Sequence, residues 1–539
     1  MKEIKELKLE DLTIEQKLGM VMHGLFTKDD NWEGFEDNLN YTIELIKKRS
    51  LGAVWVSPRF KETQRIMKAV KEAADYPILI FTDAESGLGE HMIGRHNNLG
   101  MTGREDLAYT FGKVTATTAK KMGYNIVCDP VVDMAQGDCA CGGTNRSLGS
   151  DKEMVAKLGK AIARGMHDCG ILTVAKHYPS PSKKPIPGRM PIDSHMAPTR
   201  STITKEDLLN VSLYPYKALM EENLMDGVMV GHCNLPEIDP DYPGSLSKKV
   251  IDIIRDEGFD GIVLTDALEM MGIQAKFGMD NPPGLAIAAG NDLALTWTTA
   301  KAAYERMLKC YEKGLIPDDR LDEAVRRILD AQHKVFVNSS INPELTEEDI
   351  EKFNRISTDA IYAKTDDGVS TSIPTDKKHL FVVTVKAEQE LNSEGKLTVD
   401  TFSNDWFKPA LLAKKIEELF PNSTVLPVPQ FPSATNNEAI LNAAVKHDDV
   451  IFVNFADAPA YVGSDHITQR LAALVNALNI SESLKTVIHF GNPFVLEDLM
   501  HVERLIIGPV STKSTLAAIE VLAGKREAKG ALTYEVNFN

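Results

Sequence analysis

Short, continuously apolar segments alternate with helix-like segments through the first two-thirds of the chain. Each apolar segment is rich in Val, Ile and Leu and does not alternate with polar residues, which is typical of strands buried on both faces of a parallel sheet. Helical periodicity fills the intervals, most clearly over residues 152–168 and 248–258. The predicted strands lie at residues 53–57, 78–83, 125–130, 171–177, 227–232, 262–266 and 292–297.

Repeated strand–helix units of this length are typical of an α/β protein built on a (β/α)8, TIM-like barrel, with an open doubly wound sheet as the alternative. Apolar residues make up 43% of the chain and charged residues 25%, which excludes disorder over most of its length. The later part has no G-x-G-x-x-G fingerprint, so no dinucleotide is expected. We predict a barrel over residues 1–340, a linker helix and loop over 341–378, and a smaller α/β sandwich domain over 379–539.

The charge balance narrows the classes of partner. The chain carries 77 acidic and 60 basic residues, a formal net charge of −17, with no long basic run. This field repels nucleic-acid phosphates and anionic lipid, so we expect neither nucleic acid nor a membrane as a partner. No segment has the apolar core of a signal peptide or the length of a membrane span.

The six cysteines lie within the first 310 residues, mostly in apolar surroundings. This usage indicates reduced thiols and a cytoplasmic location. Cys139 and Cys141 have the spacing of a metal half-site. No second Cys or His pair at ligand spacing supports them, so we expect neither a metal nor another cofactor.

Polar side chains stand at the carboxyl ends of five predicted strands. In a parallel barrel these ends meet at one rim, where the loops that follow the strands build the active site. We therefore expect a shared site there and assign catalysis to the barrel domain. The residues are Asp83, Asp129, Lys176 with His177, His232 and Asp266.

Several of these positions suit specific chemistry. A carboxylate at Asp266 suits a nucleophile, a general base or a metal ligand, and its alternative is a cap of the following helix. Asp193 precedes His195 by two residues, so its carboxylate can hold one ring nitrogen while the other transfers a proton. A chance tripeptide in a surface loop is the alternative there. Lys176 and His177 are adjacent donors that suit a polyhydroxylated ligand.

Motifs spread over most of the chain resemble those of the family 3 glycoside hydrolases, in particular the β-N-acetylglucosaminidase (β-hexosaminidase) branch. They occur in the family's order, and the segment around Asp266 resembles its nucleophile segment closely. The motifs are FTDAESG at 81–87, YNIVCDPVVD at 124–133, NRSLGSD at 145–151, AKHYP at 175–179, DSH at 193–195, GFDGIVLTDALEM at 258–270 and HFGNPFVLEDL at 489–499.

The resemblance implies a retaining mechanism on a small carbohydrate substrate, with terminal β-linked N-acetylglucosamine as the sugar removed. Asp266 would attack the anomeric carbon, and His195, oriented by Asp193, would serve as acid and base. An unperturbed imidazole titrates at about 6.5, close to the operating pH. The resemblance also assigns the sugar hydroxyls to Asp83, Arg146, Lys176 and His177, whose alternative is an ion-pair network at the rim. It leaves the role of Glu85 open.

The sequence departs from the branch in two places. Residues 179–191 (PSPSKKPIPGRMP) replace its Pro-Gly-His-Gly motif with a longer loop, and Ser86-Gly87-Leu88 replaces Gly-Gly-Arg, so one sugar-contacting Arg is absent. Four other functions stay open. They are a β-glucosidase or β-xylosidase with Glu388, Glu390 or Glu394 as proton donor, a β-N-acetylglucosaminide phosphorylase, a metal-dependent hydrolase, and a barrel that binds sugar without catalysis.

Overall fold

A computed structural model describes the protein and divides it into two compact units. Unit 1 is Met1–Met92, Glu105–Met134 and Asp151–Phe353, and unit 2 is Ile93–Arg104, Ala135–Ser150 and Asn354–Asn539. The domain boundaries drawn from the sequence, at residues 340 and 379, stay a prediction. The structure describes residues 4–27, 34–135, 143–180, 193–385, 387–391, 397–401, 409–456, 467–534 and 536.

Unit 1 is built on a seven-stranded parallel sheet with strand order β1-β2-β3-β6-β7-β8-β9. Every neighbouring pair runs parallel. The strands are short and buried on both faces, as their unbroken apolar sequences predict. Their bounds are β1 (His23–Phe26), β2 (Ala53–Val56), β3 (Leu79–Asp83), β6 (Ile126–Cys128), β7 (Leu172–Tyr178), β8 (Gly227–Val230) and β9 (Ile262–Thr265).

The two edges of this sheet are linked by the apolar run predicted as a strand at 292–297. Leu293 bridges Leu264 of β9, and Ala294 bridges Met22 beside β1, both in parallel. These are single bridges, because the run pairs with each edge at only one residue. Unit 1 therefore contains a curled parallel sheet, and the closed (β/α)8 barrel stays a prediction.

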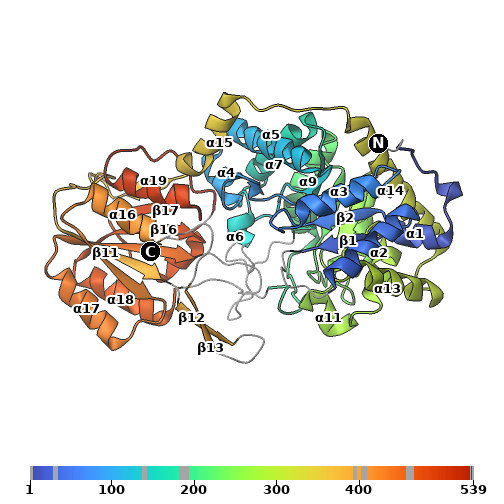
Figure 1. Cartoon of the computed structure of the whole chain (residues 1–539). Helices are drawn as coiled ribbons and strands as arrows, with labels where there is room; N and C mark the ends of the chain where they lie inside the picture. Colours follow the sequence, from blue (N-terminus) through green and yellow to red (C-terminus); the bar gives the residue numbers. More distant parts are fainter. Residues whose placement is uncertain are drawn as a thin grey trace. The chain divides into compact units, whose positions relative to one another are not determined.

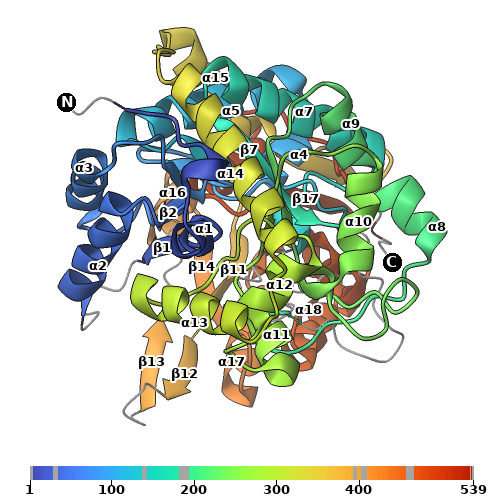
Figure 2. The same cartoon turned by 90° about the vertical axis from the view of Figure 1, so that its right-hand side faces the viewer.

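Alternate side chains of the strands form the inner face of the curled sheet. Helix α14 (Asp318–Asn338) closes the amino-end side: Ile328 and Ala331 join this cluster, and Gln332 donates to the carbonyl of Gly52 just before β2 (3.1 Å). Figure 2 shows α14 running across this end. The inner-face residues are Ala53, Leu79, Phe81, Ile126, Cys128, Leu172, Val174, Met229, Ile262, Leu264, Leu293 and Leu295.

The two helices predicted most clearly from periodicity are confirmed as α7 (Lys152–Asp168) and α10 (Lys248–Asp256). Each begins at a capping side chain, Asp151 for α7 and Ser247 for α10, which accepts a backbone N–H of the first turn. Other helices of unit 1 are α1 (Ile14–Met20), α2 (Phe35–Lys47), α3 (Thr63–Ala73), α5 (Glu105–Met122), α9 (Tyr214–Glu221), α11 (Met271–Phe277), α12 (Pro282–Ala289) and α13 (Ala300–Glu312).

Unit 2 contains a six-stranded mixed sheet with order β10-β17-β16-β15-β11-β14, in which only the β10–β17 pair is antiparallel. Helices cover both faces, α16 and α19 on one and α17 and α18 on the other (Figure 1). The bounds are β10 (Tyr362–Thr365), β11 (His379–Val385), β14 (Thr424–Pro429), β15 (Asp449–Ala456), β16 (Leu484–Gly491), β17 (Arg504–Gly508), α16 (Pro409–Leu419), α17 (Ala434–Ala444), α18 (Gln469–Ile480) and α19 (Thr512–Leu522).

A separate hairpin in unit 2 pairs β12 (Ala387–Leu391) with β13 (Leu397–Thr401). Glu388 and Glu390 lie on β12, and Glu394 lies outside the described residues. Over the part of the chain that the structure describes, no helix combines the length and apolarity needed to cross a membrane. The cytoplasmic location stays a prediction.

Candidate active site

Three predicted site residues share one position relative to the inner face of the curled sheet. Asp83, Lys176 and Asp266 each lie two residues beyond a buried inner-face side chain, namely Phe81, Val174 and Leu264. Because side chains of a strand repeat with period two, all three belong to the same face, at the carboxyl ends of β3, β7 and β9. This carboxyl-end rim is where the sequence predicted a shared site.

Lys176 is a buried cation held between two carboxylates. Its Nζ lies 2.6 Å from Asp83 Oδ1 and 2.7 Å from Glu85 Oε1, and its side chain is 2% exposed. Two charged acceptors offset the cost of burying the ammonium group. The Asp83 side chain is 51% exposed, so its remaining acceptor positions are accessible to a ligand hydroxyl. These side chains form an ion-pair network at the rim, and their binding of sugar hydroxyls stays a prediction.

His177 is oriented by a carboxylate that the sequence reasoning missed. Asp133, from the loop after β6, accepts the backbone N–H of His177 (2.8 Å) through Oδ1 and contacts Nδ1 (2.7 Å) through Oδ2. This double contact fixes the plane of the imidazole. Asp133 closes the motif YNIVCDPVVD, so its signal in the sequence was a further carboxylate soon after the end of a strand.

Asp193 and His195 form the pair that the sequence predicted. Asp193 Oδ1 accepts the backbone N–H of His195 (2.9 Å) and lies 2.8 Å from its Nδ1. Asp193 is buried, while the imidazole is partly exposed. The carboxylate thus orients the ring from the Nδ1 side. Most of the predicted longer loop, residues 181–191, lies outside the described residues.

The turn that carries this pair is attached to the chain that follows Asp266. Gly272 N–H, near the start of α11, donates to the carbonyl of Ser194 (2.9 Å). A Cβ at Gly272 would stand 3.0 Å from that carbonyl oxygen, so the close approach favours glycine. Asp266 lies only six residues before Gly272. The structure therefore ties the segment of His195 to the segment of Asp266.

Asp266 is surrounded by groups that favour its ionised form. Its backbone N–H donates to Val230 O (2.9 Å), and its Oδ1 accepts from Ala267 N–H (2.7 Å). Burial raises the pKa of the Asp266 carboxyl, but the imidazoles of His232, His177 and His195 and the Ala267 N–H together lower it below its usual value. A carboxylate ionised at neutral pH is the form that a nucleophile requires.

His232 is a further rim residue, which the sequence placed at a strand end without a role. Its Nδ1 lies 2.8 Å from Ser245 Oγ and its Nε2 lies 2.8 Å from the carbonyl of Ala267. Since a carbonyl only accepts, Nε2 carries the proton. Burial lowers the pKa of His232, while the charge of Asp266 raises it. His232 therefore positions the peptide next to Asp266.

Asp129 also stands at the carboxyl end of its strand, directly after β6. Asp129 is buried and accepts the backbone N–H of Val131 (3.2 Å). Arg146 lies on the short helix α6 (Gly143–Arg146) of unit 2, and its role stays a prediction. Cys139 and Cys141, the suggested metal half-site, lie outside the described residues.

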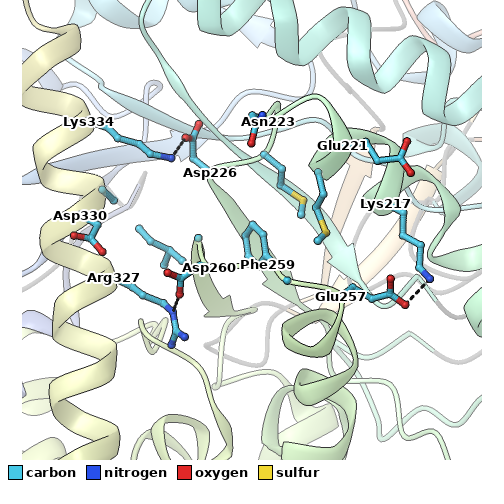
Figure 3. A pocket seen from close by; sticks show the side chains of 16 residues that line it. Lys217, Glu221, Asn223, Asp226, Glu257, Phe259, Asp260, Arg327, Asp330 and Lys334 are labelled. Atoms are coloured by element: carbon cyan, nitrogen blue, oxygen red, sulfur yellow. Dashed lines mark hydrogen bonds and ion pairs between the residues drawn. The ribbon is translucent and has the colours of Figure 1, made fainter.

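A cavity of unit 1 lies at the other end of the sheet (Figure 3). Asp226 and Gly261, which directly precede β8 and β9, line it. Its charged side chains pair with one another, as Lys334 does with Asp226 (2.8 Å), Lys217 with Glu257 (2.6 Å) and Arg327 with Asp260 (2.9 Å). Such pairs need no catalytic explanation, because residues at the amino ends of parallel barrel strands usually stabilise the fold.

Comparison with known proteins decides the class. Residues 10–331 match the glycosyl hydrolase family 3 N-terminal domain. The chain belongs to glycosyl hydrolase family 3. It is therefore a glycosidase, and the carboxyl-end rim of unit 1 lies within this family 3 domain.

Curated relatives of this family 3 chain include beta-hexosaminidases. The chain is 32% identical to beta-hexosaminidase LpqI of Mycobacterium tuberculosis over an alignment of 275 residues. This alignment covers 47% of the present chain and 67% of that protein. It is 27% identical over 266 residues to a beta-hexosaminidase of Tolumonas auensis, covering 47% and 77%. These matches concern less than half of the present chain.

Solved structures extend the likeness to nearly the whole chain. A glycoside hydrolase family 3 beta-N-acetylglucosaminidase from Paenibacillus sp. aligns with a TM-score of 0.78 at 24% identity, covering 98% of this chain and 100% of that one. The beta-glucoside phosphorylase BglX aligns with a TM-score of 0.78 at 20% identity, covering 98% and 95%. At these identities the alignments show a shared fold.

Proposed function

We propose that this glycosidase removes terminal β-linked N-acetylglucosamine from oligosaccharides or cell-wall fragments with retention of configuration. The observation that carries the proposal is the Asp193–His195 pair, whose turn is bonded to the segment after Asp266. The beta-hexosaminidase relatives support the choice of sugar.

In the first step Asp266 acts as the nucleophile. Its carboxylate attacks the anomeric carbon while the bond from that carbon to the leaving oxygen breaks, and protonated His195 gives its proton to that oxygen. The product is a glycosyl ester on Asp266 and a neutral imidazole. The lowered pKa of Asp266 supports this role, because the carboxylate needs no deprotonation before attack.

In the second step the same imidazole acts as a base. His195 accepts a proton from water, the water oxygen attacks the anomeric carbon, and the ester bond to Asp266 breaks. Asp193 keeps the ring in one orientation through both transfers, since its carboxylate holds the Nδ1 side (2.8 Å). Two displacements at one carbon give net retention.

The rim also suits the hydroxyls of the sugar that is attacked. Asp83 supplies accessible acceptor positions beside the buried Lys176, and His177 is fixed by Asp133. We propose the same binding role for Arg146, whose planar guanidinium suits a pair of neighbouring oxygens.

A substitution at His195 tests this function. We expect His195→Ala to lower turnover of an aryl β-N-acetylglucosaminide about a hundredfold or more, because proton transfer to the leaving oxygen is lost. An aryl glucoside measured in parallel separates the proposal from a β-glucosidase with a Glu donor. His447→Ala is a matched control, since that imidazole lies in unit 2 against α17. Unchanged N-acetylglucosaminide cleavage by His195→Ala would show that the imidazole is not the acid.

Phosphorolysis is the second candidate. An imidazole base carries no negative charge, so it repels a phosphate acceptor less than a carboxylate does. Running the same donor with and without phosphate decides between the two, because a phosphorylase forms the sugar 1-phosphate and a hydrolase forms the free sugar.

A further inference from the structure

The carboxyl-end rim also carries two tryptophans. Trp297 is the last residue of the run at 292–297, which bridges the two sheet edges, and the residue is 46% exposed. Trp55 lies on β2 and packs against the inner-face cluster. The two ring centroids are 5.0 Å apart and the rings are tilted by 55°. This tryptophan pair takes no part in the chemistry proposed above.

Strand alternation places Trp55 on the inner side of the rim, and the ring contact brings Trp297 to the same side. Leu293 and Leu295 belong to the inner-face cluster, and Trp297 is the next residue in that alternation. It holds the same position relative to Leu295 as Asp266 holds relative to Leu264. Its contact with Trp55, itself on the inner face, is consistent with this placement.

Trp297 is attached to the loop that carries Asp266. Its backbone N–H donates to the carboxylate of Glu269, three residues after Asp266. Leu268 N–H donates to Leu295 O (3.0 Å) just before the tryptophan. Glu269 also pairs with Arg306 of α13 (3.4 Å). The backbone of Trp297 is therefore held in place, although the residue is nearly half exposed to solvent.

The rim has two different sides. Asp83 and Lys176 come from β3 and β7, which flank β6. Trp55 and the end of the bridging run flank β1, in the next part of the curled sheet, where β2 pairs with β3. The first side offers charged groups that suit hydroxyls, and the second offers aromatic faces. The C–H bonds of a pyranose carry a slight positive charge and suit the negative face of an indole.

We propose that Trp297, supported by Trp55, stacks on a pyranose ring of the leaving group. This inference rests on the proposed function for the attacked sugar, whose hydroxyls occupy the charged side. The tryptophan pair then selects substrates whose leaving group is a neutral sugar over those with a small leaving group.

The test compares two substrates in Trp297→Ala. For N,N′-diacetylchitobiose, whose leaving group is a sugar, we expect kcat/KM to fall about three- to tenfold, mainly through KM. For methyl β-N-acetylglucosaminide we expect no change, because its leaving group is too small to stack. Trp297→Phe keeps an aromatic face and restores most of the loss. Tyr214→Ala, which removes a half-exposed ring from the start of α9, changes neither substrate.

An equal loss for both substrates, or no loss for either, overturns the proposal. A binding measurement separates its failure from that of the proposed function. In Asp266→Asn, which is expected not to cleave, titration calorimetry should detect binding of N,N′-diacetylchitobiose, and adding Trp297→Ala should weaken that binding by the same three- to tenfold. If the wild-type protein cleaves neither substrate and this binding still depends on Trp297, the proposed function fails and the stacking site stands. Binding that does not depend on Trp297 contradicts the stacking site.

Discussion

The two ends of the curled sheet in unit 1 both carry charged clusters, but the clusters differ in how they are balanced. At the amino ends, Asp292 is fully buried and meets Arg255 (2.6 Å), Arg320 (2.5 Å) and Arg327 (3.4 Å). At the carboxyl ends, the acidic groups meet imidazoles, backbone N–H groups and one lysine, and Asp83 stays half exposed. The buried ion pairs at the amino ends suit a stabilising role, whereas the accessible acceptor atoms at the carboxyl ends can bind a substrate.

The largest expected effect is on catalysis, at the carboxyl-end rim. Asp266→Asn should lower kcat for an aryl β-N-acetylglucosaminide by at least about a thousandfold, because an amide does not form the glycosyl ester. Thermal unfolding should change little. A variant that keeps more than a tenth of wild-type turnover contradicts the assignment.

The matching change at the amino ends should act on stability. Asp292→Asn leaves three guanidinium groups without their shared counter-ion, so we expect a loss of about 3–5 kcal/mol in the free energy of unfolding. Chemical denaturation of the two variants side by side measures the contrast. If Asp292→Asn is as stable as the wild type, the amino-end cluster does not have the stabilising role described above.

Acid should weaken each unit through one buried histidine. Burial lowers the pKa of His23 in unit 1 and of His489 in unit 2 to about 4. The unfolded chain binds these protons near pH 6.5 and the folded chain only near pH 4, so stability is full above about pH 6.5 and falls between the two values. Each histidine lowers the free energy of unfolding by up to about 3 kcal/mol at the acid end of this pH range. His23→Gln and His489→Gln should flatten the pH dependence of the melting temperature, and an unchanged slope would exclude these groups as its cause.

The smallest expected effect is that of a substitution at Asp260, which lines the cavity at the amino ends of the strands. Asp260 is mostly exposed although it meets Arg326 (2.8 Å) and Arg327 (2.9 Å). Asp260→Asn should cost less than about 1 kcal/mol and should leave kcat unchanged. A loss of activity in this variant would mean that the amino-end cavity, and not only the carboxyl-end rim, contributes to function.

The positions of most strands of unit 1 and the identity of several rim residues could be predicted from the sequence because both follow local rules. An unbroken apolar run marks a buried strand, and its last residues stand at the carboxyl end. The run at 292–297 obeys the same composition rule, yet it pairs only through single bridges at Leu293 and Ala294. The number of strand hydrogen bonds that a run forms depends on the strands that lie beside it, and the composition of the run does not specify these.

The partners of the rim residues were harder to predict, since they depend on contacts between distant segments. Asp133 reaches His177 across 44 positions of sequence, and His232 fixes the peptide after Asp266 through a carbonyl that every residue possesses. Trp297 has no polar group that suggests catalysis, and its position appears only from the contact of its ring with Trp55 of β2. Asp193 and His195 were predictable because their contact spans only two residues.

Trapping of the covalent intermediate tests the central claim most directly. A 5-fluoro N-acetylglucosaminyl donor with a good leaving group slows the second step, so the glycosyl ester accumulates and can be located by mass spectrometry of the digested protein. We predict one labelled peptide, with the sugar on Asp266, and no label on the Asp266→Asn variant. A label on Asp83 or Glu85, or full turnover of this donor with no labelled peptide, would contradict the account.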